Sequence, residues 1–102
     1  MEYRFFRVLK KKWSVPIILQ LKENETMRIS ELRKIFPDST DKMLIETLNI
    51  LIKYKIVKKK DYEVYPKHTE YSLTSYGKGI YIILKDIEEF CDKYENFLAV
   101  GE

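Results

Sequence analysis

The chain has few residues of the types that carry out catalysis, and the sequence does not group them. It contains one histidine, His68, and one cysteine, Cys91, which fall in different predicted elements. A structural zinc site needs about four Cys or His ligands, and a phosphate-binding loop needs closely spaced glycines. Cys91 falls within an apolar stripe, where a thiol is usually buried and unreactive. We therefore expect neither an enzyme nor a protein that holds a metal or a cofactor.

A set of polar side chains does recur at helical spacing in the middle of the chain. Thr40 is a typical N-cap, and we predict a helix from there to about Tyr54. At about 100° per residue, Leu44, Leu48 and Leu51 share one side of this helix. The opposite side is polar and carries Lys42, Glu46, Asn49 and Lys53. Such side chains can hydrogen-bond to base edges in the major groove of DNA, although a solvated helix face has the same pattern.

Shorter elements precede this helix. In chain order they are a helix over Tyr3–Lys11, a helix from an N-cap at Ser14 to Asn24, a strand at Arg28–Ile29, and a helix from an N-cap at Ser30 to Pro37. Trp13 stands directly before the second helix, and we interpret it as an anchor of the core.

Two runs rich in β-branched and aromatic residues follow the polar helix, over Ile56 to Val64 and His68 to Thr74. The proline in Tyr65-Pro66-Lys67 suits a bend, so we predict a β-hairpin that turns there. On a strand, consecutive side chains point to opposite faces, so Lys58, Lys59 and Lys60 cannot all face one partner.

A final helix is predicted from about Ser75 to near Leu98. Its apolar residues step alternately by four and three, and the seam consists of Ile80, Leu84, Ile87, Cys91, Tyr94 and Leu98. The apolar face is broader than one small monomer needs. We interpret it as part core and part homodimer interface, the alternative being that all of it packs on its own domain.

The element order is that of a winged helix-turn-helix, mainly α with a small β-hairpin. We expect residues 1–102 to form one domain, with a DNA-binding core over 13–74 and dimerisation helices over 1–12 and 75–102. The charged fraction of 34% and the net charge of +3 fit a soluble protein that can approach phosphate. The longest apolar run is far shorter than the roughly twenty residues that span a bilayer. We expect a cytoplasmic protein with no membrane partner.

Three blocks resemble the HxlR-type winged helix-turn-helix transcriptional regulators, which are related in architecture to the MarR regulators. The blocks are KKWSVPIILQL, RISELRKIFPDSTDKML and PKHTEYSLTSYGK, and the resemblance covers about Lys11 to Ile87. It implies a cytoplasmic homodimer that binds operator DNA and pairs through its N- and C-terminal helices. The chain departs from the family at Thr47, Asn49 and His68, where arginines are common, and at Lys55, where a glycine is common. It also lacks the N-terminal cysteine that oxidant-sensing members use.

These arguments predict a double-stranded DNA partner and three sets of residues. The base-reading set is Thr40, Lys42, Glu46, Thr47 and Asn49. The set that contacts the DNA backbone is Arg28, Arg33, Lys58, Lys60, Lys67 and His68. The dimer interface is Phe5, Ile80, Leu84, Ile87, Cys91, Tyr94 and Leu98.

Two further readings stay open. The chain could be a winged-helix module that has lost DNA binding and contacts a protein through Met43, Ile50 and Tyr54. Separately, and compatibly with DNA binding, a dimer could enclose a small-molecule effector of unknown identity among aromatic side chains. Those side chains are Phe5, Trp13, Phe90 and Tyr94.

Overall fold

The computed structural model describes the backbone of residues 3–101 and the side chains of residue 3 and residues 5–95. In chain order the elements are α1 (Arg4–Leu9), α2 (Ser14–Asn24), β1 (Thr26–Met27), α3 (Ile29–Ile35), α4 (Asp41–Lys53), β2 (Val57–Tyr62), β3 (His68–Leu73) and α5 (Ser75–Gly101). The strands form one antiparallel sheet in the order β1-β3-β2. The predicted fold class, mainly α with a β-hairpin, is confirmed.

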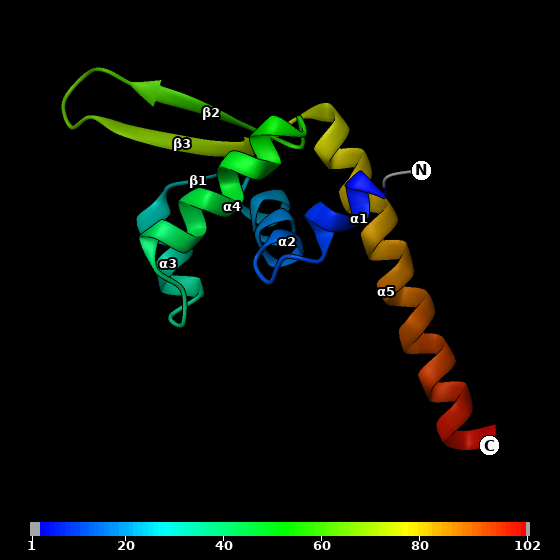
Figure 1. Cartoon of the computed structure of the whole chain (residues 1–102). Coiled ribbons are helices and arrows are strands. Elements are labelled where there is room, and N and C mark those ends of the chain that lie inside the picture. Colours follow the sequence, from blue (N-terminus) through cyan, green and yellow to red (C-terminus); the bar gives the residue numbers. More distant parts are fainter. Residues whose placement is uncertain (1–2, 102) are drawn as a thin grey trace.

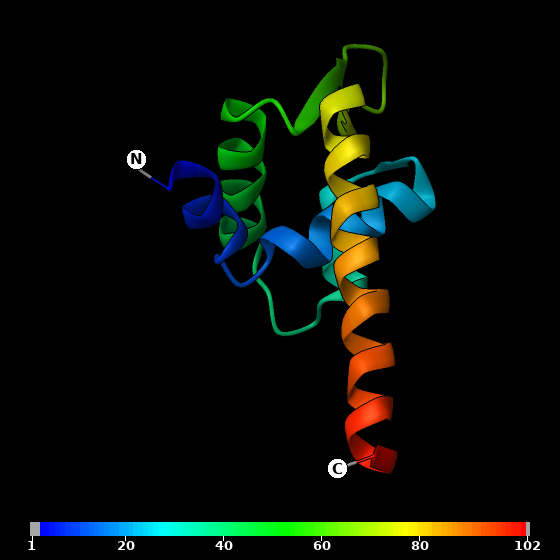
Figure 2. The ribbon, with the colours of Figure 1, turned by 90° about the vertical axis from the view of Figure 1, so that its right-hand side faces the viewer.

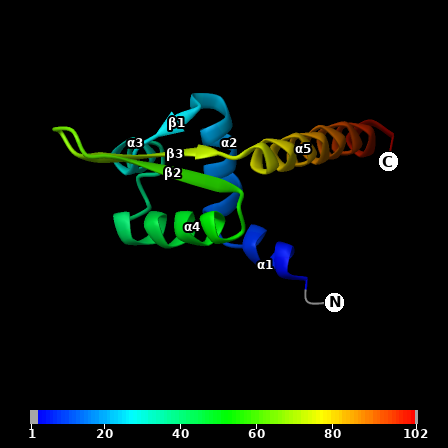
Figure 3. The same ribbon diagram turned by 90° about the horizontal axis from the view of Figure 1, so that it is seen from above.

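The hairpin and α5 extend in opposite directions from a body built of α1 to α4 (Figure 1). Seen from above, the β2–β3 hairpin projects on the side where α3 lies, and α5 leaves on the other side (Figure 3). Figure 2 shows that α5 continues well beyond the rest of the chain. This arrangement gives the molecule its elongated extents of 58 × 34 × 23 Å. The hairpin tip and the end of α5 are therefore free to contact different partners.

The core lies where α2, α4 and the base of the sheet meet. Ile17 and Ile18 of α2 are fully buried, and Leu44, Leu48 and Leu51 of α4 are buried against them. Trp13 is only 9% exposed and packs on Phe36, with ring centroids 5.2 Å apart, which confirms its role as a core anchor. Burial of these apolar side chains is the main force that holds α4 against the body.

Two sequence predictions about the segment before α3 are wrong. The short strand is Thr26–Met27 rather than Arg28–Ile29, because Met27 pairs with Tyr71 of β3 and fills the core at 3% exposure. The N-cap of α3 is Arg28 rather than Ser30, and the helix is already formed at Ile29. The carboxylate of Glu31 accepts a hydrogen bond from the backbone N–H of Arg28 at 2.8 Å, which stabilises this earlier start.

Most of the apolar face of α5 is uncovered in the single chain. Ile80 is 6% exposed, whereas Ile83, Ile87 and Phe90 are 60%, 55% and 69% exposed. The alternative that the whole face packs on its own domain is therefore wrong. Within the described residues, no helix is both long and apolar enough to cross a membrane.

Candidate nucleic-acid interface

The outward face of α4 is polar along its whole length. Lys42, Glu46, Asn49 and Lys53 are all exposed, as the helical spacing predicts, and Leu44 on the other side is fully buried. At the start of the helix, the Thr40 hydroxyl oxygen accepts a hydrogen bond from the Met43 N–H at 3.2 Å, which confirms the predicted N-cap. A rigid, capped helix thus presents hydrogen-bonding side chains to the solvent.

Thr47 does not belong to this polar face. It is 6% exposed, and its hydroxyl donates to the Met43 carbonyl oxygen at 3.0 Å within the same helix. The hydrogen bond satisfies the hydroxyl and lets the side chain pack beside the leucines. This position does not fit the prediction that Thr47 reads bases.

Positive charge flanks the first turn of α4. The Arg33 Nε of α3 lies 3.3 Å from an Asp41 carboxylate oxygen, and both side chains are more than half exposed. Such an exposed ion pair contributes little stability and can exchange partners when a phosphate approaches. Arg28 is also exposed, at the opposite end of α3.

The hairpin divides its lysines between two faces. The register pairs Lys58 with Ser72 and Lys60 with Glu70, so these two lysines share one face, and Lys59 points to the other. Lys58 lies at the base of the hairpin near α5, away from the tip, whereas Lys67 lies in the tip, where its ammonium is 4.0 Å from Glu63. Lys58 is thus the least suitable member of the predicted backbone set.

His68 is held inside the hairpin. Its ring stacks on Tyr62 with centroids 4.6 Å apart, Nδ1 lies 2.9 Å from the Pro66 carbonyl oxygen, and Nε2 lies 3.0 Å from a Glu70 carboxylate oxygen. Both neighbours accept hydrogen bonds, so both ring nitrogens donate only when the imidazole is protonated. His68 is therefore already engaged within the hairpin by Pro66 and Glu70.

Tyr71 lies on the core side of the hairpin and takes no part in the polar surface. Burial raises the pKa of its hydroxyl, and the Asp61 carboxylate raises it further. The phenol is therefore neutral at physiological pH, as a buried side chain requires.

Sequence reasoning missed two lysines next to the recognition surface. Lys11 and Lys12 line a recess of about 260 Å³ together with Trp13, Met43 and Glu46. The Lys12 ammonium lies 5.0 Å from the centre of the Trp13 ring. The available signal was the pair of lysines directly before Trp13, the N-cap of α2, because α2 packs beside α4. They place positive charge close to Glu46.

The apolar flank of α4 is not an open patch. Met43 is 38% exposed, but Ile50 and Tyr54 are partly buried against the core. Two of the three side chains through which a protein-binding module would contact its partner therefore pack within the chain.

The aromatic side chains predicted to enclose an effector do not gather within one chain. Trp13 packs on Phe36, whereas Phe90 and Tyr94 stack on each other along α5 with centroids 6.3 Å apart. Phe5 lies in a separate groove between α1 and α5. The proposed aromatic enclosure is therefore not formed by the described part of a single chain.

The groove between α1 and α5 contains much of the predicted dimer set. It has a volume of about 290 Å³ and a wholly apolar lining, formed by Phe5, Phe6, Leu9, Ile80, Ile83, Leu84 and Ile87. Cys91 and Tyr94 are exposed further along α5, and the side chain of Leu98 lies outside the described residues. In the described part of the chain, no group of Cys, His and acidic side chains is placed to hold a metal.

Comparison with known proteins identifies the family. The sequence model of the HxlR-like helix-turn-helix family matches residues 8–98. The uncharacterized HTH-type transcriptional regulator YkvN of Bacillus subtilis is 36% identical over 96 residues, which cover 93% of this chain and 80% of YkvN. A similar HTH-type regulator of Methanothermobacter thermautotrophicus is 31% identical over 83 residues, covering 81% and 63% of the two chains.

Solved structures agree with this result. The HTH-type transcriptional regulator ytcD superposes with a TM-score of 0.82 at 28% identity, over 90% of this chain and 93% of ytcD. The reduced form of the B. subtilis transcriptional regulator YodB superposes with a TM-score of 0.78 at 27% identity, over 87% of this chain and 86% of YodB. A MarR-family regulator from Enterococcus faecalis, at 22% identity and a TM-score of 0.86, shares the fold. The chain therefore belongs to the HxlR-like helix-turn-helix family of DNA-binding transcriptional regulators.

Proposed function

We propose that the chain regulates transcription as a cytoplasmic homodimer that places α4 in the major groove of duplex DNA and the β2–β3 hairpin on the adjacent backbone. The observation that carries this proposal is the continuous polar face of α4, which is rigidly capped at Thr40 and stands beside a projecting hairpin. A helix with this face has the dimensions and the hydrogen-bonding groups that the major groove admits.

The side chains of α4 suggest which bases are read. The Asn49 amide can pair with an adenine edge, and Lys42 can donate to guanine. Glu46 can accept from a cytosine amino group, and the nearby Lys11 and Lys12 reduce the repulsion between its carboxylate and the phosphates. We include Thr40 and exclude Thr47, whose hydroxyl is bonded inside the helix.

A set of basic side chains fits contacts with the DNA backbone. This proposed set is Lys11, Lys12, Arg28, Arg33, Lys60, Lys67 and His68, all of which flank α4 or lie along the hairpin. Contacts of this kind position the protein without selecting the sequence. Each phosphate that the set neutralises releases counterions, so binding should weaken steeply as salt rises.

Dimerisation would use the uncovered apolar face of α5 and the groove beside α1. Several large apolar side chains there are more than half exposed in the single chain, which is costly in water. A two-fold axis through this face would relate two α4 helices, so the operator should be a rough palindrome with half-sites about one helical turn apart.

The test is fluorescence anisotropy with a duplex selected from a random pool, measured at several salt concentrations. We expect Lys42→Ala with Asn49→Ala to lower affinity for the selected duplex by at least about tenfold and to relax sequence preference. Lys93→Ala, which removes the same charge from α5, is the matched control and should leave the affinity within about twofold. Failure to select any duplex, or binding that does not depend on salt, would contradict the proposal.

A further inference from the structure

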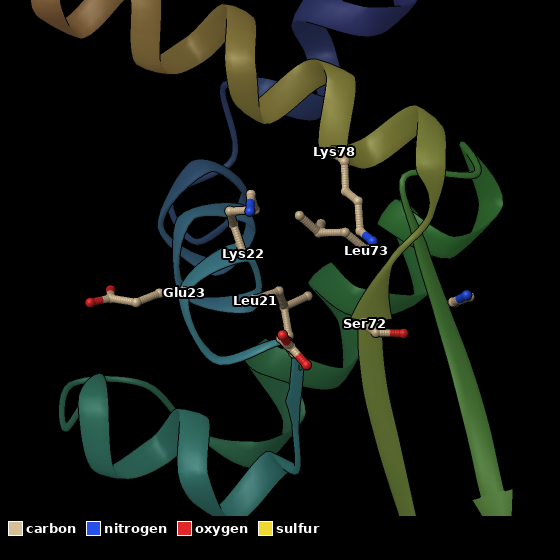
Figure 4. A pocket seen from close by; sticks show the side chains of 8 residues that line it. Leu21, Lys22, Glu23, Ser72, Leu73 and Lys78 are labelled. Carbon is tan, nitrogen blue, oxygen red and sulfur yellow. The ribbon is translucent and has the colours of Figure 1, made fainter.

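A cavity of about 500 Å³ lies where the DNA-binding body meets α5. It is lined from α2 by Leu21, Lys22 and Glu23, from the sheet by Lys58, Ser72 and Leu73, and from α5 by Lys78, with Glu25 at the turn after α2 (Figure 4). Its volume is within the range of pockets that bind small molecules. None of its lining residues belongs to the polar face of α4.

Lysines from three different elements line this cavity. Lys22 belongs to α2, Lys58 to β2 and Lys78 to the first turns of α5. None of the ion pairs found among the described side chains involves these lysines. The Lys22 ammonium lies 5.7 Å from the centre of the Tyr81 ring, so it is held between α2 and α5. All three lysines carry positive charge, so an anion in the cavity would be attracted to each of them.

The rest of the lining limits what can bind. Leu21 and Leu73 are 1% and 3% exposed and form a rigid apolar floor, and the Ser72 hydroxyl offers a hydrogen bond beside it. Glu23 points away from Ser72, Leu73 and Lys78 in Figure 4. Together with Glu25 it leaves a small net positive charge over the whole lining, which disfavours a long polyanion and suits a compact one.

We propose that this cavity binds a small, multiply charged anion that carries phosphate or carboxylate groups, and that this ligand is an effector. A ligand held at once by Lys22, Lys58 and Lys78 connects the body to α5 and fixes the direction in which α5 leaves it. If the chain is a dimer through α5, as proposed above, that direction sets the distance between the two α4 helices. The ligand then changes affinity for DNA without touching the reading surface.

Binding is tested first without DNA, by titration calorimetry of the full chain with pyrophosphate and, separately, with citrate at constant ionic strength. Lys22→Gln and Lys78→Gln should each weaken binding by at least about tenfold, since each removes a charge-assisted hydrogen bond. Lys93→Gln is the matched control on α5 and should leave binding unchanged. Glu25→Gln should strengthen binding, because it removes a repelling charge.

The two probes separate the possible sources of the anion. Binding of pyrophosphate alone indicates a phosphorylated ligand, binding of citrate alone indicates a polycarboxylate, and binding of both indicates that charge and size decide. All three results support the site, provided that the lysine variants weaken the binding. Binding of neither probe, or equal binding by the variants and the wild type, would overturn it. All lysines changed here are exposed, and unchanged melting curves without ligand exclude unfolding as the cause.

The regulatory part is tested by DNA anisotropy with and without a saturating amount of the bound probe. We expect affinity for the selected duplex to change by at least about fivefold, and the change to disappear in Lys78→Gln. An unchanged affinity would overturn the effector role and leave DNA binding itself intact. Absence of DNA binding in both conditions would instead contradict the function proposed above. The calorimetric test of ligand binding is made without DNA, so its result would still stand.

Discussion

The hydroxyl of Thr74 donates a hydrogen bond to the carbonyl oxygen of Lys55, 19 residues earlier in the sequence, at a distance of 2.6 Å. The Thr74 hydroxyl oxygen in turn accepts a hydrogen bond from the Gly77 N–H at 2.9 Å and so caps the start of α5. The Thr74 backbone N–H also donates to the Ile56 carbonyl oxygen at 3.0 Å. One residue therefore ties the turn after α4, the helix proposed to read DNA, to the helix proposed to form the dimer.

Replacing Thr74 should test this joint. Thr74→Val keeps the shape but removes the side-chain hydrogen bonds with Lys55, Ile56 and Gly77, and we expect a loss of about 1–2 kcal/mol in the free energy of unfolding. Thr74→Ser keeps the hydroxyl and should stay within about 0.5 kcal/mol of the wild type. Urea unfolding at one fixed protein concentration measures both variants. Equal losses in the two variants would show that the hydroxyl is not the important group.

The glycines of α5 form a natural pair for a second test. A Cβ on Gly77 would lie 2.1 Å from the Ile56 carbonyl oxygen, a backbone atom that cannot move aside, whereas a Cβ on Gly79 would meet nothing within 4 Å. Gly77→Ala should therefore destabilise the fold by at least about 2 kcal/mol through overpacking. Gly79→Ala should stabilise it by about 0.5–1 kcal/mol, since alanine favours a helix over glycine. Thermal unfolding distinguishes the two, and a stabilising Gly77→Ala would contradict the packing.

The backbone at Lys55 has the conformation that glycine favours, in line with the glycine that the family resemblance implies at this position. Lys55 has a φ of 63°, a left-handed conformation that a side chain with a Cβ disfavours. We expect Lys55→Gly to raise the free energy of unfolding by about 0.5–1 kcal/mol, after allowance for the greater freedom of glycine in the unfolded chain. Lys55→Ala is the control, because it removes the charge but keeps the Cβ, and it should give no increase. A higher free energy of unfolding in both variants would show that the loss of the charge, and not of the Cβ, is the cause.

The elements that sequence reasoning placed well are those whose signal is local. The spacing of Leu44, Leu48 and Leu51 identified the buried face of α4, and Thr40 was recognisable as its cap because both signals lie within one helix. Thr47 is in the predicted base-reading set, although the same spacing places it about 60° from Leu44, on the buried side. Its place in the base-reading set follows the family resemblance, but a hydrogen bond to Met43 lets its side chain pack inside.

Features that depend on distant residues were not predictable. The strand at Met27 is fixed by its pairing with Tyr71, 44 positions later (71 − 27), and not by the propensity of its own segment. The lysine-lined cavity joins Lys22, Lys58 and Lys78, which no sequence pattern connects. In each case the position depends on how separate elements pack, and a single segment of sequence does not contain that information.

The exposed seam of α5 gives the sharpest test of the proposed dimer. Ile87 and Ile82 are 55% and 57% exposed, so neither is needed to fold the single chain, but they lie about 140° apart around the helix. Ile87 shares its side with Leu84 and lines the groove beside α1, whereas Ile82 faces away from the seam. Only one of these two isoleucines should therefore be buried by a second copy.

Ile87→Glu would bury a carboxylate in that apolar interface, and we expect the dimer dissociation constant to rise by at least about 100-fold, which corresponds to roughly 3 kcal/mol. Ile82→Glu introduces the same charge outside the interface and should change the dimer dissociation constant by less than about threefold. Sedimentation over a range of protein concentrations measures both. The monomeric variant should also lose affinity for a two-half-site duplex, because each half-site alone is bound weakly. If Ile87→Glu remained as dimeric as Ile82→Glu, the seam would not be the interface.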